Sequence, residues 1–263
     1  GRAGQRGAGG AGTGGGVVVS RCYALGMAVD VLFLHESKHI EPSCPIHLLP
    51  MGVVSMANWL GAHGIESEII HHAIELALDP EFDVVRAVEQ SGAKLLCMPL
   101  HWHATSRNVI ALAREIKRTN PGLPICLGGY TASAFASEIL ETFPHVDYVI
   151  RGDGEVAVLE LARRLLVRGA SLDSVPNLAR RCGGVYVESR ERHLNHAEDL
   201  GRYDFCVFDR LRHFEHYCQR GLMEGKIGLE RREPGIFYCN AGRGCAYDCS
   251  FCGGGRSAQR FIA

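Results

Sequence analysis

Residues 94–130, KLLCMPLHWHATSRNVIALAREIKRTNPGLPICLGGY, contain the pattern that decides the fold. Residues 94–100 and 124–127 are short and mostly apolar, which is typical of strands buried on both faces of a sheet. Residues 106–119 predict a helix that begins at Ser106, a residue type that favours helix starts. A strand, a helix and a second strand in this order predict two parallel strands joined by a crossover helix.

The same alternation continues on both sides of this stretch. Further strands are predicted at 29–35, 66–71 and 147–151, and further helices at 50–63, 82–90, 131–142 and 155–168. Five strands that alternate with five helices predict an α/β fold, a five-stranded doubly wound parallel sheet with helices on both faces. Ligands of such open sheets bind beyond the carboxyl ends of the strands, which here are followed by loops 36–49, 101–105, 128–130 and 152–154.

The composition limits the kinds of molecule that this protein is expected to bind. Hydrophobic residues make up 46% of the 263 residues, an ordinary share for a globular protein. A formal net charge of −1 gives no strong attraction to nucleic acid or to a membrane, so neither is expected as a partner. Residues 17–34 are apolar but contain Arg21 and Asp30, so they do not predict a spanning helix. The basic N-terminus leads into glycines rather than an apolar stretch, so we expect no secretory signal and a cytoplasmic location.

Composition also suggests where the folded part begins. Residues 1–16 are mostly Gly, Ala and Arg, and such a segment cannot bury a core. We therefore predict a disordered Gly-rich tail at 1–27, with the fold beginning near Met27, and a ligand-binding α/β domain at 28–172.

The pattern changes after residue 172. Residues 178–182 and 185–188 flank two glycines and predict a β-hairpin, which a charged, aromatic linker with a short helix near 209–220 follows. The predicted hairpin and linker together cover 173–234. Residues 235–263 form a last predicted part, in which a strand at 235–240 leads into a cysteine-rich loop.

That loop contains Cys245, Cys249 and Cys252 in the spacing C-x3-C-x2-C. Three nearby thiolates can hold three corners of a [4Fe–4S] cluster and leave one iron open to a small molecule. Zinc would require a fourth ligand, which Cys239, Cys218 or a histidine could supply, and a loop without metal is the third alternative. Other cysteines, such as those at 97 and 126, lie in apolar strand patterns and are interpreted as core residues.

The segment CAYDCSFC at 245–252, preceded by a predicted strand and Arg-Gly, strongly resembles the cluster loop of radical S-adenosylmethionine (SAM) enzymes. The resemblance implies that the three cysteines bind a [4Fe–4S] cluster whose open iron chelates S-adenosyl-L-methionine. It also implies that Phe251 lies near the adenine, with packing within the loop as the less favoured alternative. Reduction of the cluster would then cleave SAM to a 5′-deoxyadenosyl radical, with an electron donor such as flavodoxin or ferredoxin.

The upstream domain, taken with this loop, resembles the cobalamin-binding half of B12-dependent radical SAM proteins. The resemblance rests on LPMGV at 49–53 before the first long helix, two glycines after the fourth strand, and GDGE at 152–155 after the fifth. It implies a flavodoxin-like cobalamin-binding domain, with contacts to cobalamin from Met51, Gly52, Thr105, Ser106, Gly128, Gly129, Gly152 and Glu155. Two of these have a simpler alternative, because Ser106 suits a helix N-cap and Glu155 suits the first turn of a helix.

One departure from the wider cobalamin-binding pattern concerns the cobalt ligand. Some B12 proteins place a histidine on cobalt through Asp-x-His-x-x-Gly after the first strand, whereas residues 34–42 here read LHESKHIEP. His35 and His39 are therefore not assigned as cobalt ligands. His101 and His103 lie on a loop that faces the expected ligand, where solvent-facing histidines are also common.

Together these features predict a cobalamin-dependent radical SAM enzyme, with methyl transfer to an unactivated centre of a small-molecule or peptide substrate as the expected reaction. The alternatives are a non-catalytic cobalamin carrier or sensor with a structural metal loop, and a radical SAM enzyme that binds no cobalamin. A radical SAM barrel needs many more strands than follow residue 252, so we expect this chain to be the first part of such an enzyme and to be inactive alone.

Overall fold

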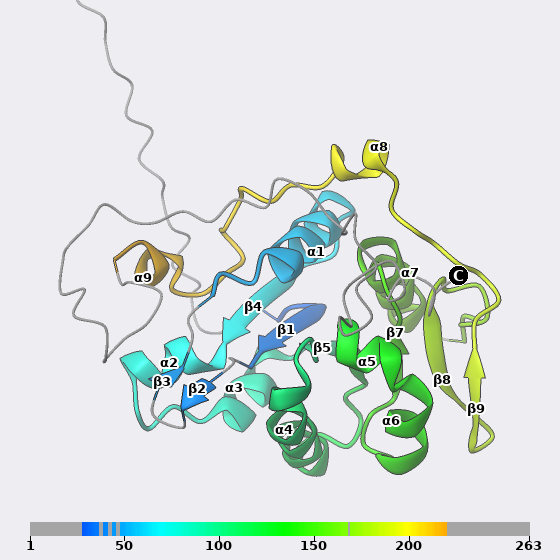
Figure 1. Cartoon of the computed structure of the whole chain (residues 1–263), viewed down its shortest axis with the longest axis horizontal. Helices are drawn as coiled ribbons and strands as arrows, with labels where there is room; N and C mark the ends of the chain where they lie inside the picture. Colours follow the sequence, from blue (N-terminus) through cyan, green and yellow to red (C-terminus); the bar gives the residue numbers. More distant parts are fainter. Residues whose placement is uncertain (1–27, 37–38, 42–43, 46–47, 168, 220–263) are drawn as a thin grey trace, which may run out of the picture.

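Five neighbouring parallel strands and an antiparallel hairpin at one side form a seven-stranded sheet with the order β4-β1-β5-β6-β7-β8-β9. The computed structural model describes residues 28–36, 39–41, 44–45, 48–167 and 169–219, which Figure 1 draws in colour. The parallel strands are β1 (Val31–His35), β4 (Ser67–His71), β5 (Leu95–Pro99), β6 (Ile125–Gly128) and β7 (Tyr148–Ile150). All five lie where the sequence places a strand, so the predicted α/β fold with its parallel sheet is confirmed.

The predicted hairpin exists, but it belongs to the same sheet. Its strands are β8 (Leu178–Cys182) and β9 (Val185–Glu188), and β8 pairs antiparallel with β7. The turn residues Gly183 and Gly184 have φ of 59° and 83°, values that a two-residue hairpin turn requires and that glycine adopts without strain. The sequence predicts this hairpin outside the α/β domain, together with the linker that follows it, because its pattern does not reveal which strand it pairs with.

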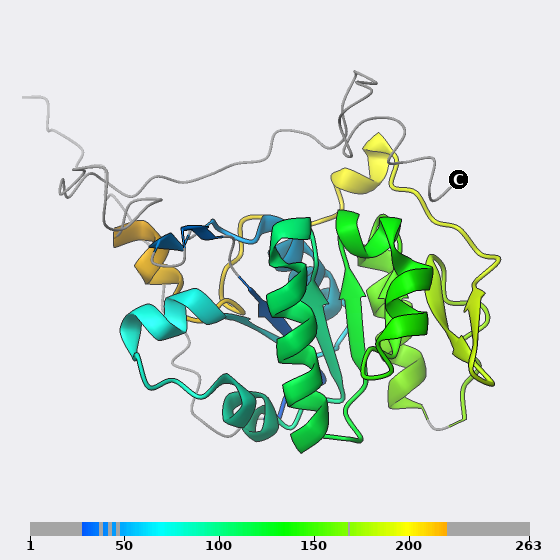
Figure 2. The ribbon, with the colours of Figure 1, turned by 60° about the horizontal axis from the view of Figure 1, so that its bottom comes forward.

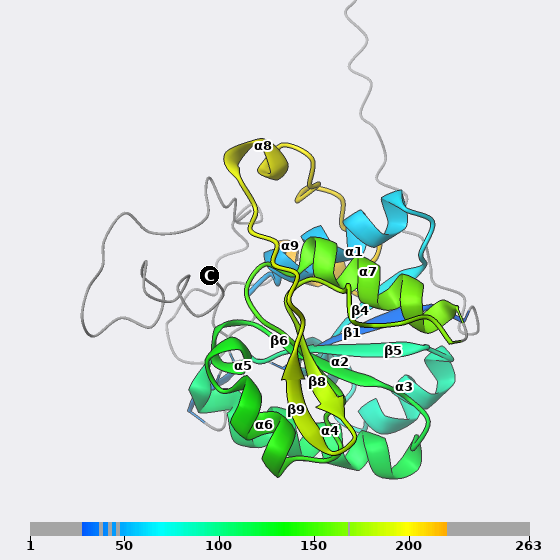
Figure 3. The ribbon, with the colours of Figure 1, turned by 90° about the vertical axis from the view of Figure 1, so that its right-hand side faces the viewer.

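Helices cover both faces of the sheet (Figure 3). The helices α1 (Met51–Ala62) and α7 (Glu155–Leu166) pack together on one face. On the other face lie α3 (Val84–Ser91), α4 (Ser106–Thr119), α5 (Tyr130–Ala134) and α6 (Ala136–Thr142). The two buried clusters therefore alternate along each strand, as the period of two in a strand requires.

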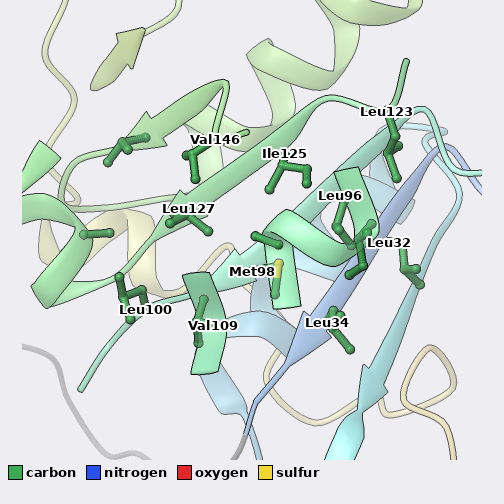
Figure 4. Packing of buried hydrophobic residues seen from close by; sticks show 14 of the residues in the cluster. Leu32, Leu34, Leu96, Met98, Leu100, Val109, Leu123, Ile125, Leu127 and Val146 are labelled. Carbon is green, nitrogen blue, oxygen red and sulfur yellow. The ribbon is translucent and has the colours of Figure 1, made fainter. Parts of the chain in front are cut away.

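Figure 4 shows the cluster on the α4 face, where Leu96 and Met98 of β5 lie beside Ile125 and Leu127 of β6. Val109 of α4 covers them, and none of the five side chains is more than 1% exposed. Fully burying one such side chain contributes about 1.5–3 kcal/mol, so these central strands hold the sheet together.

Three local elements differ from the sequence-based expectation. The helix predicted at 131–142 is two helices that break at Phe135, because Arg151 Nε donates to the carbonyl of Ser133 (3.2 Å), an oxygen that a continuous helix would offer to residue 137. The helix α2 (His72–Leu78) follows β4 directly and was not predicted. The loop predicted at 36–49 contains a short hairpin, β2 (His39–Glu41) and β3 (Cys44–Pro45).

Residues 189–219, here called the strap, cross the molecule from β9 to the opposite edge of the sheet. They include α8 (Ala197–Leu200) and α9 (Phe214–Gln219), and Figures 1 and 2 show them in yellow to orange. At the far edge, Ile69 of β4 donates its N–H to the carbonyl of Arg210 (2.7 Å) and accepts from the N–H of Arg212 (3.1 Å). The strap therefore pairs with β4, where the sequence predicts only a linker with a helix near 209–220.

A buried carboxylate fastens the strap beside α1 and α7. Glu155, which is 2% exposed, accepts from the hydroxyl of Ser55 in α1 (3.1 Å) and from the side-chain amide of Asn195 in the strap (3.0 Å). Tyr203 in turn donates its hydroxyl to Asn195 Oδ1 (2.8 Å). Because a buried carboxylate without partners is costly, this arrangement joins three segments that are distant in sequence.

No helix within the described ranges combines the length and the apolar character needed to cross a bilayer.

We expect Glu155→Ala to lower the free energy of unfolding by about 2 kcal/mol, because it leaves buried polar groups of Ser55 and Asn195 unpaired. Glu155→Gln should cost less, since it keeps one acceptor. Urea denaturation followed by circular dichroism measures both. Glu160→Ala is the matched control on the same helix, where a surface pair with Arg163 contributes at most about 1 kcal/mol. Equal midpoints for Glu155→Ala and Glu160→Ala would contradict the anchoring role.

Candidate functional site

The order of the parallel strands locates the candidate site. Numbered along the chain, they lie in the order 2-1-3-4-5, so the winding direction changes between β1 and β5. The helix that follows β1 covers one face and the helix that follows β5 covers the other. In Figure 1 the arrowheads of β1 and β4 point toward α2 and the β2–β3 hairpin. We call this end of the sheet the carboxyl edge, and a ligand crevice is expected there.

The loops after β5, β6 and β7 are bonded into one surface at this edge. Leu100 donates its N–H to the carbonyl of Gly128 (2.7 Å), and Thr131 donates its hydroxyl to the carbonyl of His101 (3.1 Å). Gly152, with φ of 82°, donates its N–H to the hydroxyl of Ser133 (2.9 Å). The sequence-predicted residues of these three loops are thus brought together.

The two glycines after β6 have different surroundings. Gly129 has φ of 99°, and a Cβ there would lie 3.0 Å from the carbonyl oxygen of Leu100, so the packing of two loops already requires glycine. Among the described residues, a Cβ at Gly128 would meet only the carbonyl oxygen of Ile150 at 3.8 Å, an ordinary contact. The fold therefore has room for a Cβ at Gly128, and glycine there would also allow a ligand to approach the backbone closely.

The other predicted contact residues divide into buried and accessible ones. Met51 is 6% exposed and packs in the core beside α7, while Gly52 next to it is exposed and has no neighbour within 4 Å of a Cβ position. Thr105 is buried and donates its hydroxyl to the carbonyl of Trp102 (2.9 Å), whereas Ser106 is half-buried at the start of α4. Glu155 already accepts from two neighbours.

Histidines that the sequence analysis did not assign to the ligand lie at the same edge. His35 is the last residue of β1 and pairs in register with His71, the last residue of β4. Their rings contact edge to face, with centroids 4.6 Å apart. His101 follows β5, and its ring lies 4.5 Å from that of Tyr130. The signal that could have found the pair is that two neighbouring strands each end in histidine.

Burial keeps two of these rings neutral at pH 7. It lowers the pKa of His35 to about 4, against a smaller opposing effect of Glu36, and it lowers the pKa of His101 as well. Trp102 and Tyr130, which lie shortly after the ends of β5 and β6, add half-exposed aromatic rings. The carboxyl edge therefore presents neutral imidazoles, exposed aromatic rings and the backbone of glycines that follow the strands. Such a surface suits a large neutral ligand with polar amide groups.

The predicted cluster residues Cys245, Cys249, Cys252 and Phe251, and the strand expected at 235–240, lie outside the described residues. Within the described part, no group of three or more His, Cys, Asp or Glu side chains is placed to hold a metal ion. Cys97 and Cys126 are buried on neighbouring strands, so the interpretation of these two cysteines as core residues is confirmed.

Comparison with known proteins identifies the domain. Residues 46–162 match the family model of the B12 binding domain. The chain is 26% identical over 229 residues to hopanoid C-3 methylase of Methylococcus capsulatus, an alignment that covers 85% of this chain and 39% of that protein. It is 27% identical over 155 residues to the cobalamin-dependent radical SAM methyltransferase TokK of Streptomyces tokunonensis, covering 58% of this chain and 21% of TokK.

Among solved structures, the cobalamin-dependent SAM radical enzyme OxsB with aqua-cobalamin and SAM bound superposes with a TM-score of 0.52 at 14% identity. The match covers 63% of this chain and 23% of OxsB, and at this identity it shows a shared fold. The chain thus spans well under half of each of these proteins. Residues 46–162 are a B12-binding domain, carried by a chain that is similar to cobalamin-dependent radical SAM methyltransferases.

Proposed function

We propose that this chain is the cobalamin-binding part of a cobalamin-dependent radical SAM enzyme that transfers a methyl group to an unactivated centre. The observation that carries the proposal is the B12-binding domain at 46–162 followed by the C-x3-C-x2-C loop at 245–252. The names of the similar proteins support both halves, since TokK is a cobalamin-dependent radical SAM methyltransferase.

The residues of the carboxyl edge fit cobalamin. Within the described chain, the buried Nδ1 atom of His35 has no hydrogen-bond partner, and the backbone at Gly128 is open to a close approach. The imidazoles of His35 and His101 are neutral, so they can bond the carboxamides at the rim of the corrin without a charge mismatch. Bound there, cobalamin would supply a carrier for the methyl group.

Each predicted contact residue has a distinct part in this proposal. Ser106, Gly128, Gly152 and the exposed Gly52 are accessible to the ligand or shape its backbone surface. Met51, Thr105, Gly129 and Glu155 are engaged in packing or internal hydrogen bonds, and they would act by holding the loops in place. This division follows from burial and bonding, which sequence does not display.

The radical half of the proposal rests on residues outside the described ranges. Cys245, Cys249 and Cys252 would ligate a [4Fe–4S] cluster with an open iron for S-adenosyl-L-methionine, and Phe251 would pack near its adenine. We further propose a cytoplasmic location, an electron donor such as flavodoxin or ferredoxin, and a small-molecule or peptide substrate. Neither nucleic acid nor a membrane has a part in this proposal.

We expect the chain to retain hydroxocobalamin after gel filtration and Gly128→Ala to weaken its binding at least about threefold, a loss of roughly 0.7 kcal/mol of contact. The variant should melt at the wild-type temperature, because the added methyl group meets no closer atom than 3.8 Å. Absorbance titration of the corrin measures the affinity. Gly122→Ala, in a turn with open space around it, is the control and should bind as wild type does. Absence of corrin from the purified wild-type complex would rule out the cobalamin site.

Anaerobic reconstitution with iron and sulfide should give the electron paramagnetic resonance signal of a reduced [4Fe–4S] cluster. Cys252→Ala should lose most of that signal, because the cluster loses one of three thiolate ligands. Cys206→Ala, which removes an exposed free thiol of the strap, is the matched control and should keep it. Equal signals from both variants, or zinc in place of iron, would contradict the cluster assignment.

A further inference from the structure

At the switch point of the sheet, His35 carries a buried polar atom that has no hydrogen-bond partner among the described residues. Its Nδ1 makes no hydrogen bond to any residue in the described ranges, although His35 ends the central strand β1. Leaving a buried donor or acceptor unpaired is unfavourable, so such an atom in a folded protein requires a reason. A ligand that supplies the missing partner is a reason consistent with its position at the carboxyl edge.

The ring of His35 is oriented by its neighbour His71. The two residues are register partners on β1 and β4, and their ring planes meet at 82°. His71 is 1% exposed and therefore has little freedom to move. Any rotation of His71 would remove the surface against which the edge-to-face contact is made, so the orientation of His35 depends on what holds His71.

Tyr217 of the strap is a second aromatic residue that contacts His71. Its hydroxyl forms a hydrogen bond with Nδ1 of His71, and the ring centroids lie 5.7 Å apart. Burial raises the pKa of Tyr217, so the hydroxyl stays protonated and donates. In a neutral imidazole, a bond donated to Nδ1 leaves the ring proton on Nε2, so this hydrogen bond selects one tautomer of His71.

The strap residues before Tyr217 fix the place of α9. Arg212 donates from Nε and Nη2 to both oxygens of Glu68 in β4 (2.7 and 2.9 Å). His213 contacts Glu75 of α2 (3.3 Å), and Phe214 stacks on Phe208 with centroids 4.2 Å apart. A bidentate pair with a buried carboxylate sets direction as well as distance, so Tyr217 reaches His71 in a defined geometry.

We propose that Tyr217 is a positioning residue of the cofactor site: by fixing His71 it holds His35 so that Nδ1 of His35 bonds a neutral polar group of the bound corrinoid, such as a peripheral carboxamide. This inference rests on the proposed function and extends its site beyond the matched B12-binding residues 46–162. The cofactor site then includes a part of the strap, and the isolated matched domain would bind the corrinoid less tightly.

Titration of the 263-residue chain with hydroxocobalamin tests this inference. Tyr217→Phe keeps the ring and removes the hydroxyl, and we expect it to weaken binding about 3- to 10-fold, the usual effect of one hydrogen bond. His35→Phe should weaken binding at least as much while its melting temperature stays equal or rises, because it removes the unpaired atom. Tyr186→Phe, which removes a hydroxyl bonded to Glu188 on β9, is the matched control with wild-type affinity.

Nitrogen-15 spectra of the histidines separate positioning from general stability. Without cobalamin, His71 should show a single tautomer protonated at Nε2 in the wild type and in Tyr186→Phe, and a tautomer mixture in Tyr217→Phe. Wild-type affinity in either Tyr217→Phe or His35→Phe overturns the inference while leaving the proposed function standing, as does an unchanged His71 tautomer in Tyr217→Phe. A wild-type chain that retains no hydroxocobalamin overturns both.

Discussion

The parallel pairing of β1 with β4 on one side and β5 on the other is the constraint on which the rest of the structure depends. Since β1 is flanked on both sides, its apolar residues alternate between the two buried clusters and the strand is covered on both faces. The helix that follows β1 and the helix that follows β5 lie on opposite faces of the sheet. That divergence opens the carboxyl edge between them, which is where a parallel sheet of this order binds its ligand.

The strap connects segments that are distant in sequence, and it therefore also shapes the carboxyl edge. Glu155 joins the strap to α1 and α7 at one end, and Arg212 joins it to Glu68 at the other. Both anchors are buried carboxylates whose partners come from segments distant in sequence. Such partners are costly to remove, so the strap contributes to the stability of the domain and also to the shape of the site through Tyr217 and His71.

Sequence patterns predicted the parallel sheet because each of its strands is a short apolar run between turn signals. They also predicted the bounds of α4, and the hairpin around Gly183, where the tolerance of glycine for positive φ agrees with the final fold. The N-cap of α4 is Thr105 and Ser106 is its first helical residue, so the N-cap alternative for Ser106 is wrong. Sequence patterns did not predict that the hairpin joins the sheet or that the strap pairs with β4. Both depend on pairings between distant segments, which leave no periodic signal of their own.

Sequence patterns likewise predicted some features of the candidate site and missed others. Glycines at strand ends indicated loops that the structure brings together at the carboxyl edge, yet only the surroundings of Gly128 and Gly129 distinguish an accessible position from a packing requirement. Glu155 suited the first turn of a helix on sequence grounds, and its bonds to Ser55 and Asn195 come from residues that no motif links to it. His35 was set aside as a cobalt ligand, and its unpaired Nδ1 is visible only once its neighbours are placed.

Hydrogen–deuterium exchange of the chain with and without hydroxocobalamin can show whether the carboxyl edge of the sheet binds cobalamin, because protection reports each loop separately. We expect slower exchange at residues 100–106, 128–130 and 152–154, with no change in the β8–β9 hairpin at 178–188. Protection confined to the hairpin or to α3, with the three loops unchanged, would contradict this expectation.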